Sequence, residues 1–218
     1  MSSFINRIRV SSIFLVLLLL LGCSGPPEGQ DKANKGVESY KTGDYQQAVD
    51  QLNAGLKAGV YQSQESDLWT ILGNSYDELD EYEKAIEAHK KALEVDPESY
   101  KAWTNLGAAY RHSKNYEDAR KSYQKALELN PDYPEAHASL GALYIFENEP
   151  KLAVESLEKA LELDDSLPVS HANIAVAYAK LGRFKDARKS LAKANSLGYQ
   201  NGDVIEGLIE DEKKARNG

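Results

Sequence analysis

The chain has 218 residues and carries 34 Asp and Glu against 26 Lys and Arg side chains, a formal net charge of −8 at pH 7. This acidic surplus argues against a nucleic acid partner and against attachment to anionic lipid by surface charge. The single cysteine, Cys23, excludes an internal disulfide framework.

A short apolar segment lies near the start of the chain. Residues Val10–Leu21 are predominantly apolar, and Arg7 and Arg9 precede them. A basic start followed by about a dozen apolar residues is typical of a secretory signal peptide, and it is too short for a comfortable transmembrane span. We therefore predict that residues 1–22 are a signal peptide that is cleaved, which would make the mature chain more acidic by two charges.

The end of this segment, Leu20-Leu21-Gly22-Cys23, resembles the lipobox of bacterial lipoproteins. The resemblance implies cleavage before Cys23, which then carries a thioether-linked diacylglycerol and an acylated amine, commonly palmitate. Several acyl chains anchor a protein stably where a single chain would not. The alternatives are an ordinary secreted protein with a free thiol, or an anchor that is not cleaved.

The lipobox also implies a location and a short tether. A lipoprotein of this kind belongs to the bacterial cell envelope, attached to a membrane on its exported side. Ser24 follows the cysteine where Asp would favour the inner membrane, so the resemblance favours the outer membrane in a Gram-negative organism. Residues 23–31 would form the lipidated cysteine and its tether, because residues 24–31 show no periodicity.

A repeat of 34 residues fills most of the remaining chain. Gly73, Gly107, Gly141 and Ala175 stand at equal intervals, and each is followed by Tyr three residues later. This period and signature resemble the tetratricopeptide repeat (TPR). The resemblance implies two helices per repeat and an all-α fold, a right-handed TPR solenoid of about five helix pairs plus a C-terminal capping helix.

The repeat divides the chain into predicted segments. A degenerate first repeat spans 32–65, four well-formed repeats span 66–99, 100–133, 134–167 and 168–201, and the capping helix with its tail spans 202–218. The interval from Ala48 to Ala85 is 37 residues, so we expect the extra residues in a loop at Gly59–Glu65. The capping helix should cover the last repeat with an apolar stripe of four side chains: Val204, Ile205, Leu208 and Ile209.

Nothing in the sequence predicts catalysis, a metal or a cofactor apart from the lipid on Cys23. There is no phosphate loop, nucleophile elbow or zinc-type cluster. His137 and His171 stand where Trp69 and Trp103 stand in other repeats, which indicates a packing role. Paired acids such as those at 164–165 fall at turns. We therefore predict a protein that is not an enzyme.

In TPR solenoids the first helix of each pair lines a concave groove, where ligands usually bind. Helical spacing then assigns the side chains that face inward. The candidate residues for binding a partner peptide or helix are Asn74, Asp77, Lys101, Thr104, Asn105, Arg111, Ala142, Phe146, Asn173 and Val176.

Two known binding modes of the family can be compared with this groove. The carboxylate clamp of chaperone-type modules uses two asparagines, which Asn74 and Asn105 match, with lysines and an arginine. Thr70, Glu135 and Ser139 occupy the cation positions here, so we reject this mode. The asparagine ladder that binds an extended peptide backbone is partly kept, by Asn105 and Asn173.

The groove is polar in its N-terminal half and apolar in its C-terminal half, which includes Phe146 and Val176. An exposed apolar stripe usually marks an interaction surface, although the final helix or a second copy of the chain could cover it.

The interpretation of the whole sequence is a non-catalytic, membrane-anchored scaffold or adaptor that binds envelope proteins. It resembles TPR lipoproteins of pilus, secretin or cell-wall machinery. The alternatives are a self-associating structural or assembly factor, with homo-oligomers possible, and a regulator of a partner enzyme.

Overall fold

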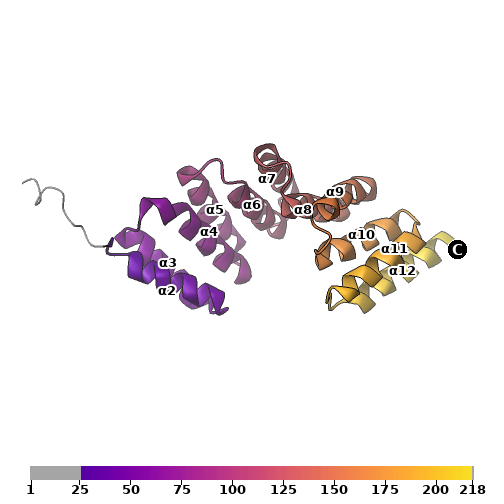
Figure 1. The fold of residues 1–218 in the computed structure, drawn as a ribbon, viewed down its shortest axis with the longest axis horizontal. Coiled ribbons are helices and arrows are strands. Elements are labelled where there is room, and N and C mark those ends of the chain that lie inside the picture. The colour runs from indigo at the N-terminus through magenta and orange to yellow at the C-terminus, as the bar shows by residue number, and fades with distance from the viewer. Residues whose placement is uncertain (1–25, 218) are drawn as a thin grey trace, which may run out of the picture.

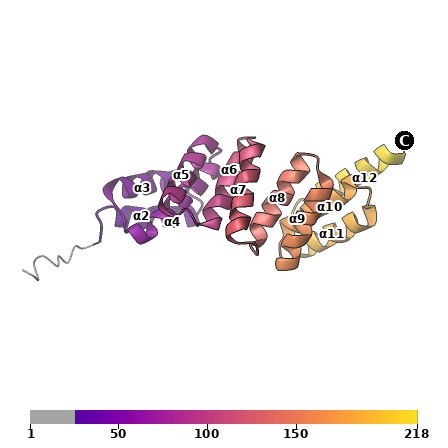
Figure 2. The same cartoon turned by 90° about the horizontal axis from the view of Figure 1, so that it is seen from above.

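The computed structural model describes residues 26–217, so the predicted signal peptide and Cys23 lie outside the described residues. Every regular element in this part of the chain is a helix. The helices are α2 (Gln30–Lys41), α3 (Tyr45–Ala58), α4 (Gln62–Glu78), α5 (Tyr82–Val95), α6 (Tyr100–His112), α7 (Tyr116–Leu129), α8 (Pro134–Phe146), α9 (Pro150–Leu163), α10 (Pro168–Lys180), α11 (Phe184–Ser196) and α12 (Gly202–Asn217). They follow one another along an elongated arch, with α2 and α3 at one end and α12 at the other (Figures 1 and 2).

The helices form five antiparallel pairs. We call the first members, α2, α4, α6, α8 and α10, the A helices and their partners, α3, α5, α7, α9 and α11, the B helices. Each A helix packs most extensively on its own B helix, and successive A helices also touch one another. The single helix α12 packs against α10 and α11. The predicted all-α solenoid with a C-terminal capping helix is confirmed.

One residue at positive φ closes the turn inside each pair. The N–H of the next residue donates to a carbonyl five residues earlier, as Asn115 does to Tyr110 at 2.8 Å. This is the hydrogen bond of a helix C-terminal cap, and it reverses the chain within a few residues. The residues at positive φ are Gly43, Asp80, Lys114, Asn148 and Gly182.

A glycine of the A helix faces a large side chain of the B helix where the two helices cross. A Cβ atom added at Gly107 would lie 2.6 Å from the Tyr123 ring, and one at Gly73 would lie 2.5 Å from the His89 ring. Gly141 meets Leu157 in the same way. The large partners Tyr123, His89 and Leu157 are almost completely buried. In these pairs the A-helix backbone approaches the B-helix side chain so closely that only glycine fits without rearrangement. The last pair has Ala175 at the equivalent position.

The loop predicted at Gly59–Glu65 is wrong in its second half, because α4 already begins at Gln62. The extra residues lengthen α4 by about one turn, and this helix has 17 residues. Gln30, which is buried, joins this added turn to the start of α2. Its amide donates to Gln64 at 2.8 Å and accepts from the N–H of Tyr61 at 3.1 Å.

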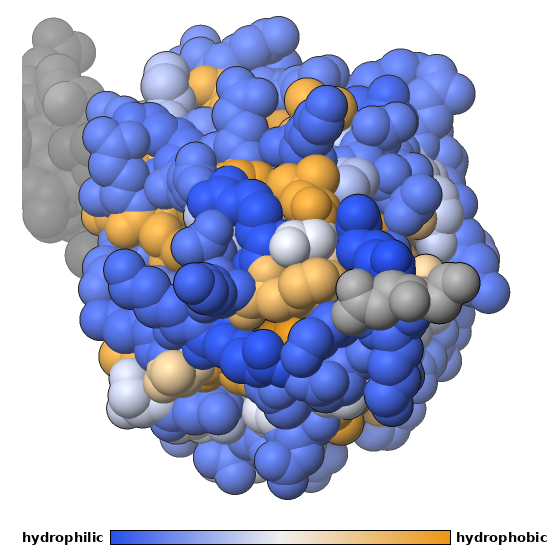
Figure 3. All heavy atoms as spheres, turned by 90° about the vertical axis from the view of Figure 1, so that its right-hand side faces the viewer, coloured by the Kyte–Doolittle hydropathy of each residue, from blue (hydrophilic) through white to orange (hydrophobic). Residues whose placement is uncertain are grey.

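The capping helix buries only half of its predicted apolar stripe. Ile205 and Ile209 are buried against α10 and α11, whereas Val204 is 63% and Leu208 45% exposed. Figure 3 shows apolar surface in the centre of the C-terminal end of the molecule, with hydrophilic surface around it. Between residues 26 and 217, none of the helices combines the length and apolar composition that crossing a bilayer requires.

Replacing Gly107 by Ala should destabilise the protein by about 1–3 kcal/mol, because the new methyl group would overlap the buried Tyr123 ring. Gly207 in α12 is the matched control, since a Cβ atom there meets no atom within 4 Å. Gly207→Ala should stabilise α12 by about 0.5–1 kcal/mol through helix propensity alone. Denaturant unfolding of both variants measures the two changes, and shifts of the same sign would contradict the close-approach role of Gly107.

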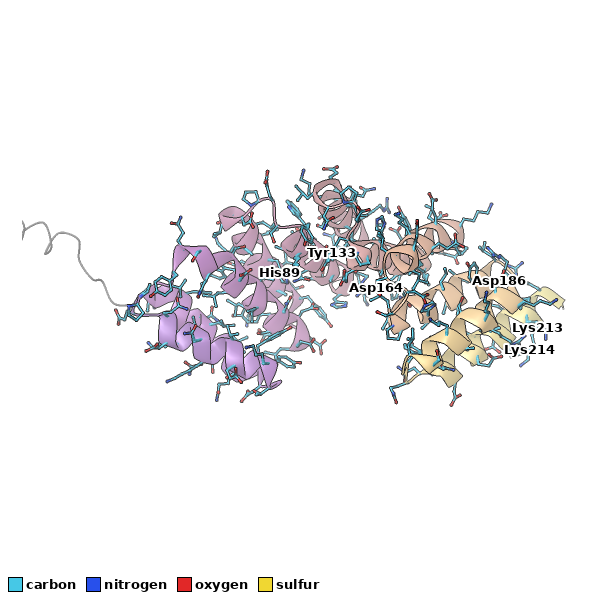
Figure 4. The ribbon with its side chains drawn as sticks, in the orientation of Figure 1. His89, Tyr133, Asp164, Asp186, Lys213 and Lys214 are labelled. Carbon is cyan, nitrogen blue, oxygen red and sulfur yellow. The ribbon has the colours of Figure 1, made fainter. Side chains whose placement is uncertain are left out.

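His89 should make stability depend on pH. Burial lowers the pKa of His89 to about 4, an effect that the charge of Asp77 opposes, and the side chain is 1% exposed (Figure 4). Because the unfolded state takes up a proton near pH 6.5, stability is fully present above that pH and is lost as pH falls from about 6.5 to about 4. The loss should be roughly 3 kcal/mol.

The variant His89→Leu isolates this effect, since Leu52 and Leu157 fill the same position in other pairs. Unfolding free energies of both proteins, measured from pH 8 to pH 4, should diverge in favour of the variant below about pH 6.5. At neutral pH the variant should be no less stable, because the buried Nδ1 of His89 has no hydrogen-bond partner within the described residues. Parallel curves would show that His89 is not the titrating group.

Candidate functional site

The A helices form the groove, and its C-terminal half contains a hollow of about 500 Å³. Side chains of α6, α8 and α10 line it, together with the loop that leads into α10. The lining residues are Arg111, Glu135, Ala138, Ser139, Ala142, Phe146, Leu167, Pro168, Val169, Ser170 and Asn173. Four of the ten predicted groove residues therefore meet here: Arg111, Ala142, Phe146 and Asn173.

The other predicted residues lie outside the hollow. Burial raises the pKa of the Tyr40 hydroxyl, and the Asn74 side chain near it opposes that rise. Lys101 is exposed and Asn105 partly buried on α6. Val176 is partly buried against the core of the last repeats.

Thr104 does not reach the groove surface, which corrects its assignment as a groove residue. It is 6% exposed, and its hydroxyl donates to the carbonyl of Tyr100 at 2.9 Å. Ala172, two repeats later in the same column, is 1% exposed. Ala138, between them in the same column, is partly buried and lines the hollow, so the exposure of this column changes from one repeat to the next.

A chain of contacts crosses the rim of the groove. Nδ1 of His112 lies 2.8 Å from a carboxylate oxygen of Asp77, and Nε2 lies 2.8 Å from a guanidinium nitrogen of Arg111. A neutral imidazole protonated on Nδ1 satisfies both contacts, because Nδ1–H then donates to Asp77 while Nε2 accepts from Arg111. Asp77 of α4 and Arg111 of α6, both predicted groove residues, are thus held in place by His112, which was not among the predicted residues.

Two aromatic rings continue this chain of contacts. The Arg111 guanidinium lies 5.8 Å from the centre of the Phe146 ring, and Tyr116 stacks on the same ring at 6.4 Å. Phe146 nevertheless remains 62% exposed, and Val169 is 58% exposed. These are the two large apolar side chains of the hollow that are open to solvent, and a cation over an aromatic face adds a modest attraction.

The Tyr123 hydroxyl lies beneath the groove. The side chain extends from α7 across Gly107 and is completely buried. Burial raises the pKa of the Tyr123 phenol, while the nearby Arg111 and Ser139 side chains oppose that rise. The hydroxyl oxygen has no well-formed hydrogen bond to any residue between 26 and 217, so a buried polar atom remains unsatisfied next to the hollow.

The histidines that replace tryptophan have a structural role. Nε1 of Trp103 donates to the carbonyl of Pro97 at 2.9 Å, and Nε2 of His137 lies 2.8 Å from the carbonyl of Pro131. Nε2 of His171 lies 3.0 Å from the carbonyl of Asp165. Among the described residues, no group of three or more His, Cys, Asp or Glu side chains could hold a metal ion.

Comparison with known families agrees with this geometry. Models of the tetratricopeptide repeat match residues 66–99, 100–133, 122–155 and 169–197, together more than half of the chain. The chain belongs to the tetratricopeptide repeat family. Membership of this family supports the role of a protein-interaction scaffold, and scaffolds of this family are generally non-catalytic. No curated protein sequence matches the chain.

Solved structures of TPR proteins share the fold. The crystal structure of MamA protein has 26% identity and a TM-score of 0.61, covering 76% of this chain and 89% of that one. Pseudomonas aeruginosa PilF has 22% identity and a TM-score of 0.71, covering 87% and 86%. TTC0263, a thermophilic TPR protein of Thermus thermophilus, has 24% identity and a TM-score of 0.67, covering 84% and 98%. At these identities the last two show the fold alone.

Proposed function

We propose that this protein is a lipid-anchored, non-catalytic scaffold of the bacterial cell envelope, and that it binds a segment of a partner protein in its groove. The sequence Leu20-Leu21-Gly22-Cys23 supports the anchor, with acyl chains on Cys23 holding the protein at the membrane. The observation that carries the binding site is the hollow of about 500 Å³ with Phe146 and Val169 exposed in it.

Hydrophobic burial supplies the driving force for this binding. Complete burial of a fully exposed Phe or Val side chain is worth about 1.5–3 kcal/mol. Because Phe146 is 62% and Val169 58% exposed, covering both would contribute roughly one to two factors of ten in affinity. The ring of Phe146 is already held by Tyr116 and Arg111. The Phe146 side chain therefore loses little additional conformational entropy when a partner covers it.

Self-association is a second candidate, because α12 leaves Val204 and Leu208 exposed. The first turn of this helix is acidic, with Asp203, and its last turn is basic, with Lys214 and Arg216. Two copies of α12 packed about a two-fold axis would bury Val204 and Leu208 against the same side chains of the second copy. The function would then be assembly of the scaffold itself.

Mass spectrometry of the protein from its native membrane should find residue 23 at the N-terminus, carrying a diacylglycerol and an acylated amine. Cys23→Ala removes the thiol that accepts the lipid, and it should leave a precursor that retains residues 1–22. Ser24→Ala is the matched control and should still be processed. An unmodified cysteine in the wild-type protein, or a wild-type chain that keeps residues 1–22, would refute the anchor.

Site-specific photo-crosslinking in living cells tests the groove. Probes that replace Phe146 or Val169 should trap one discrete partner protein, and a probe at Glu87 on the outer helix α5 should not. A probe at Leu208 reports the second candidate, since it would trap another copy of the chain. If the groove probes give the same products as Glu87, the hollow is not the binding site.

A further inference from the structure

Arg111 is held at the rim of the hollow by groups without negative charge. Elsewhere in the described chain, Arg120, Arg183 and Arg188 each pair with a carboxylate. Arg111 instead donates to His112, whose other nitrogen faces Asp77, and lies over the Phe146 ring. A guanidinium has five N–H donors, so this arrangement fixes the side chain while most of its donors and its positive charge stay available.

Two hydroxyl groups lie close to this guanidinium. Ser139 lines the hollow, and the Tyr123 hydroxyl lies beneath it, completely buried and without a well-formed hydrogen bond among residues 26–217. The Arg111 and Ser139 side chains lie beside the Tyr123 hydroxyl, and of the two hydroxyl-bearing residues Ser139 is the one that a ligand in the hollow can contact. A charged acceptor forms stronger hydrogen bonds with such donors than a neutral one.

The rest of the hollow sets the direction of a bound segment. Glu135, in the first turn of α8, precedes Phe146, in its last turn, by 11 positions. At 1.5 Å per residue the two lie about 16 Å apart along the helix. Ala138 and Ala142 form an apolar floor between them. One end of the hollow is therefore cationic, the middle apolar and the other end anionic.

We propose that the hollow recognises a carboxylate followed by an apolar side chain in an extended segment of a partner protein. The carboxylate binds Arg111 and the hydroxyl of Ser139, which line the hollow, and the apolar side chain packs on Phe146 and the alanine floor. Glu135 repels the carboxylate from the opposite end. The inference rests on the proposed function of the groove and specifies its ligand. Arg111 is not one of the positions that hold the cations of the chaperone-type carboxylate clamp, which are Thr70, Glu135 and Ser139 in this chain.

The test uses synthetic peptides and the purified full chain, with backbone amide NMR signals of Ser139 and Asn173 as the readout. Acetyl-Gly-Asp-Leu-Gly-amide should bind roughly tenfold more tightly than the same peptide with Asn in place of Asp, because only the first carries the charge. Acetyl-Gly-Gly-Leu with a free C-terminal carboxylate has no acidic side chain. Comparing its affinity with that of the Asp peptide shows whether the bound carboxylate belongs to a chain end or to a side chain.

Three variants test which side chains cause the preference for the Asp peptide. Arg111→Gln should abolish the preference for the Asp peptide, whereas Arg120→Gln, which removes an arginine paired with Glu147, should leave it unchanged. Ser139→Ala should reduce the preference severalfold, because it deletes a hydroxyl that lines the hollow.

Equal binding of the Asp and Asn peptides, a preference that survives Arg111→Gln, or no binding of any peptide at millimolar concentration would overturn the proposal. None of these outcomes bears on whether Phe146 and Val169 probes trap a partner in cells. Partner crosslinks without a carboxylate preference would refute this ligand and keep the groove as the binding site. Absence of groove crosslinks would remove the proposed function itself.

Discussion

The close approach of each A helix to its B helix is the constraint on which the rest of the structure depends. It places a small residue on one side, glycine at Gly107 and alanine at Ala175, and a large buried side chain on the other, as at Tyr123. The large side chain crosses the A helix towards the groove. The same contact that stabilises a helix pair therefore carries a B-helix side chain to the groove floor, which is how Tyr123 comes close to Arg111 and Ser139.

Replacement of tryptophan by histidine shows which property the repeats retain. Trp103, His137 and His171 differ in size, yet each places a ring nitrogen within hydrogen-bond distance of the carbonyl six residues earlier. That carbonyl lies in the turn before the A helix, so the bond fixes where the next repeat begins. Since the ring nitrogen acts as a donor, Nε2 of these histidines is not free to bind a metal.

The repeat period predicts the helix pairs because each pair must bury equivalent positions, such as Leu106 and Leu140, and both are buried. It does not predict the contacts between repeats. The bridge from Asp77 to His112 joins side chains 35 residues apart, and it depends on how far one repeat is rotated against the next. A helical wheel has no information about that rotation, so it assigned Thr104 to the groove and could not predict the contact between His112 and Asp77.

Insertions are ambiguous for a related physical reason. Three extra residues nearly complete one helical turn, so a loop and a longer helix satisfy the same spacing. Buried Gln30 favours the helix, because its side chain bonds both to Tyr61 and to Gln64 in the added turn. That pairing joins residues more than 30 positions apart, and it becomes visible only in the folded chain.

Positions that repeat and positions that differ have separate roles in this solenoid. The column of Gly73, Gly107, Gly141 and Ala175 contains only small residues, because a large side chain of the B helix packs closely against each of these glycines. At the rim, Arg111 and Phe146 belong to columns in which the residue type changes from one repeat to the next. A change there costs little stability, because Phe146 is largely exposed. Binding specificity can therefore vary at the rim while the contacts between paired helices keep the fold unchanged.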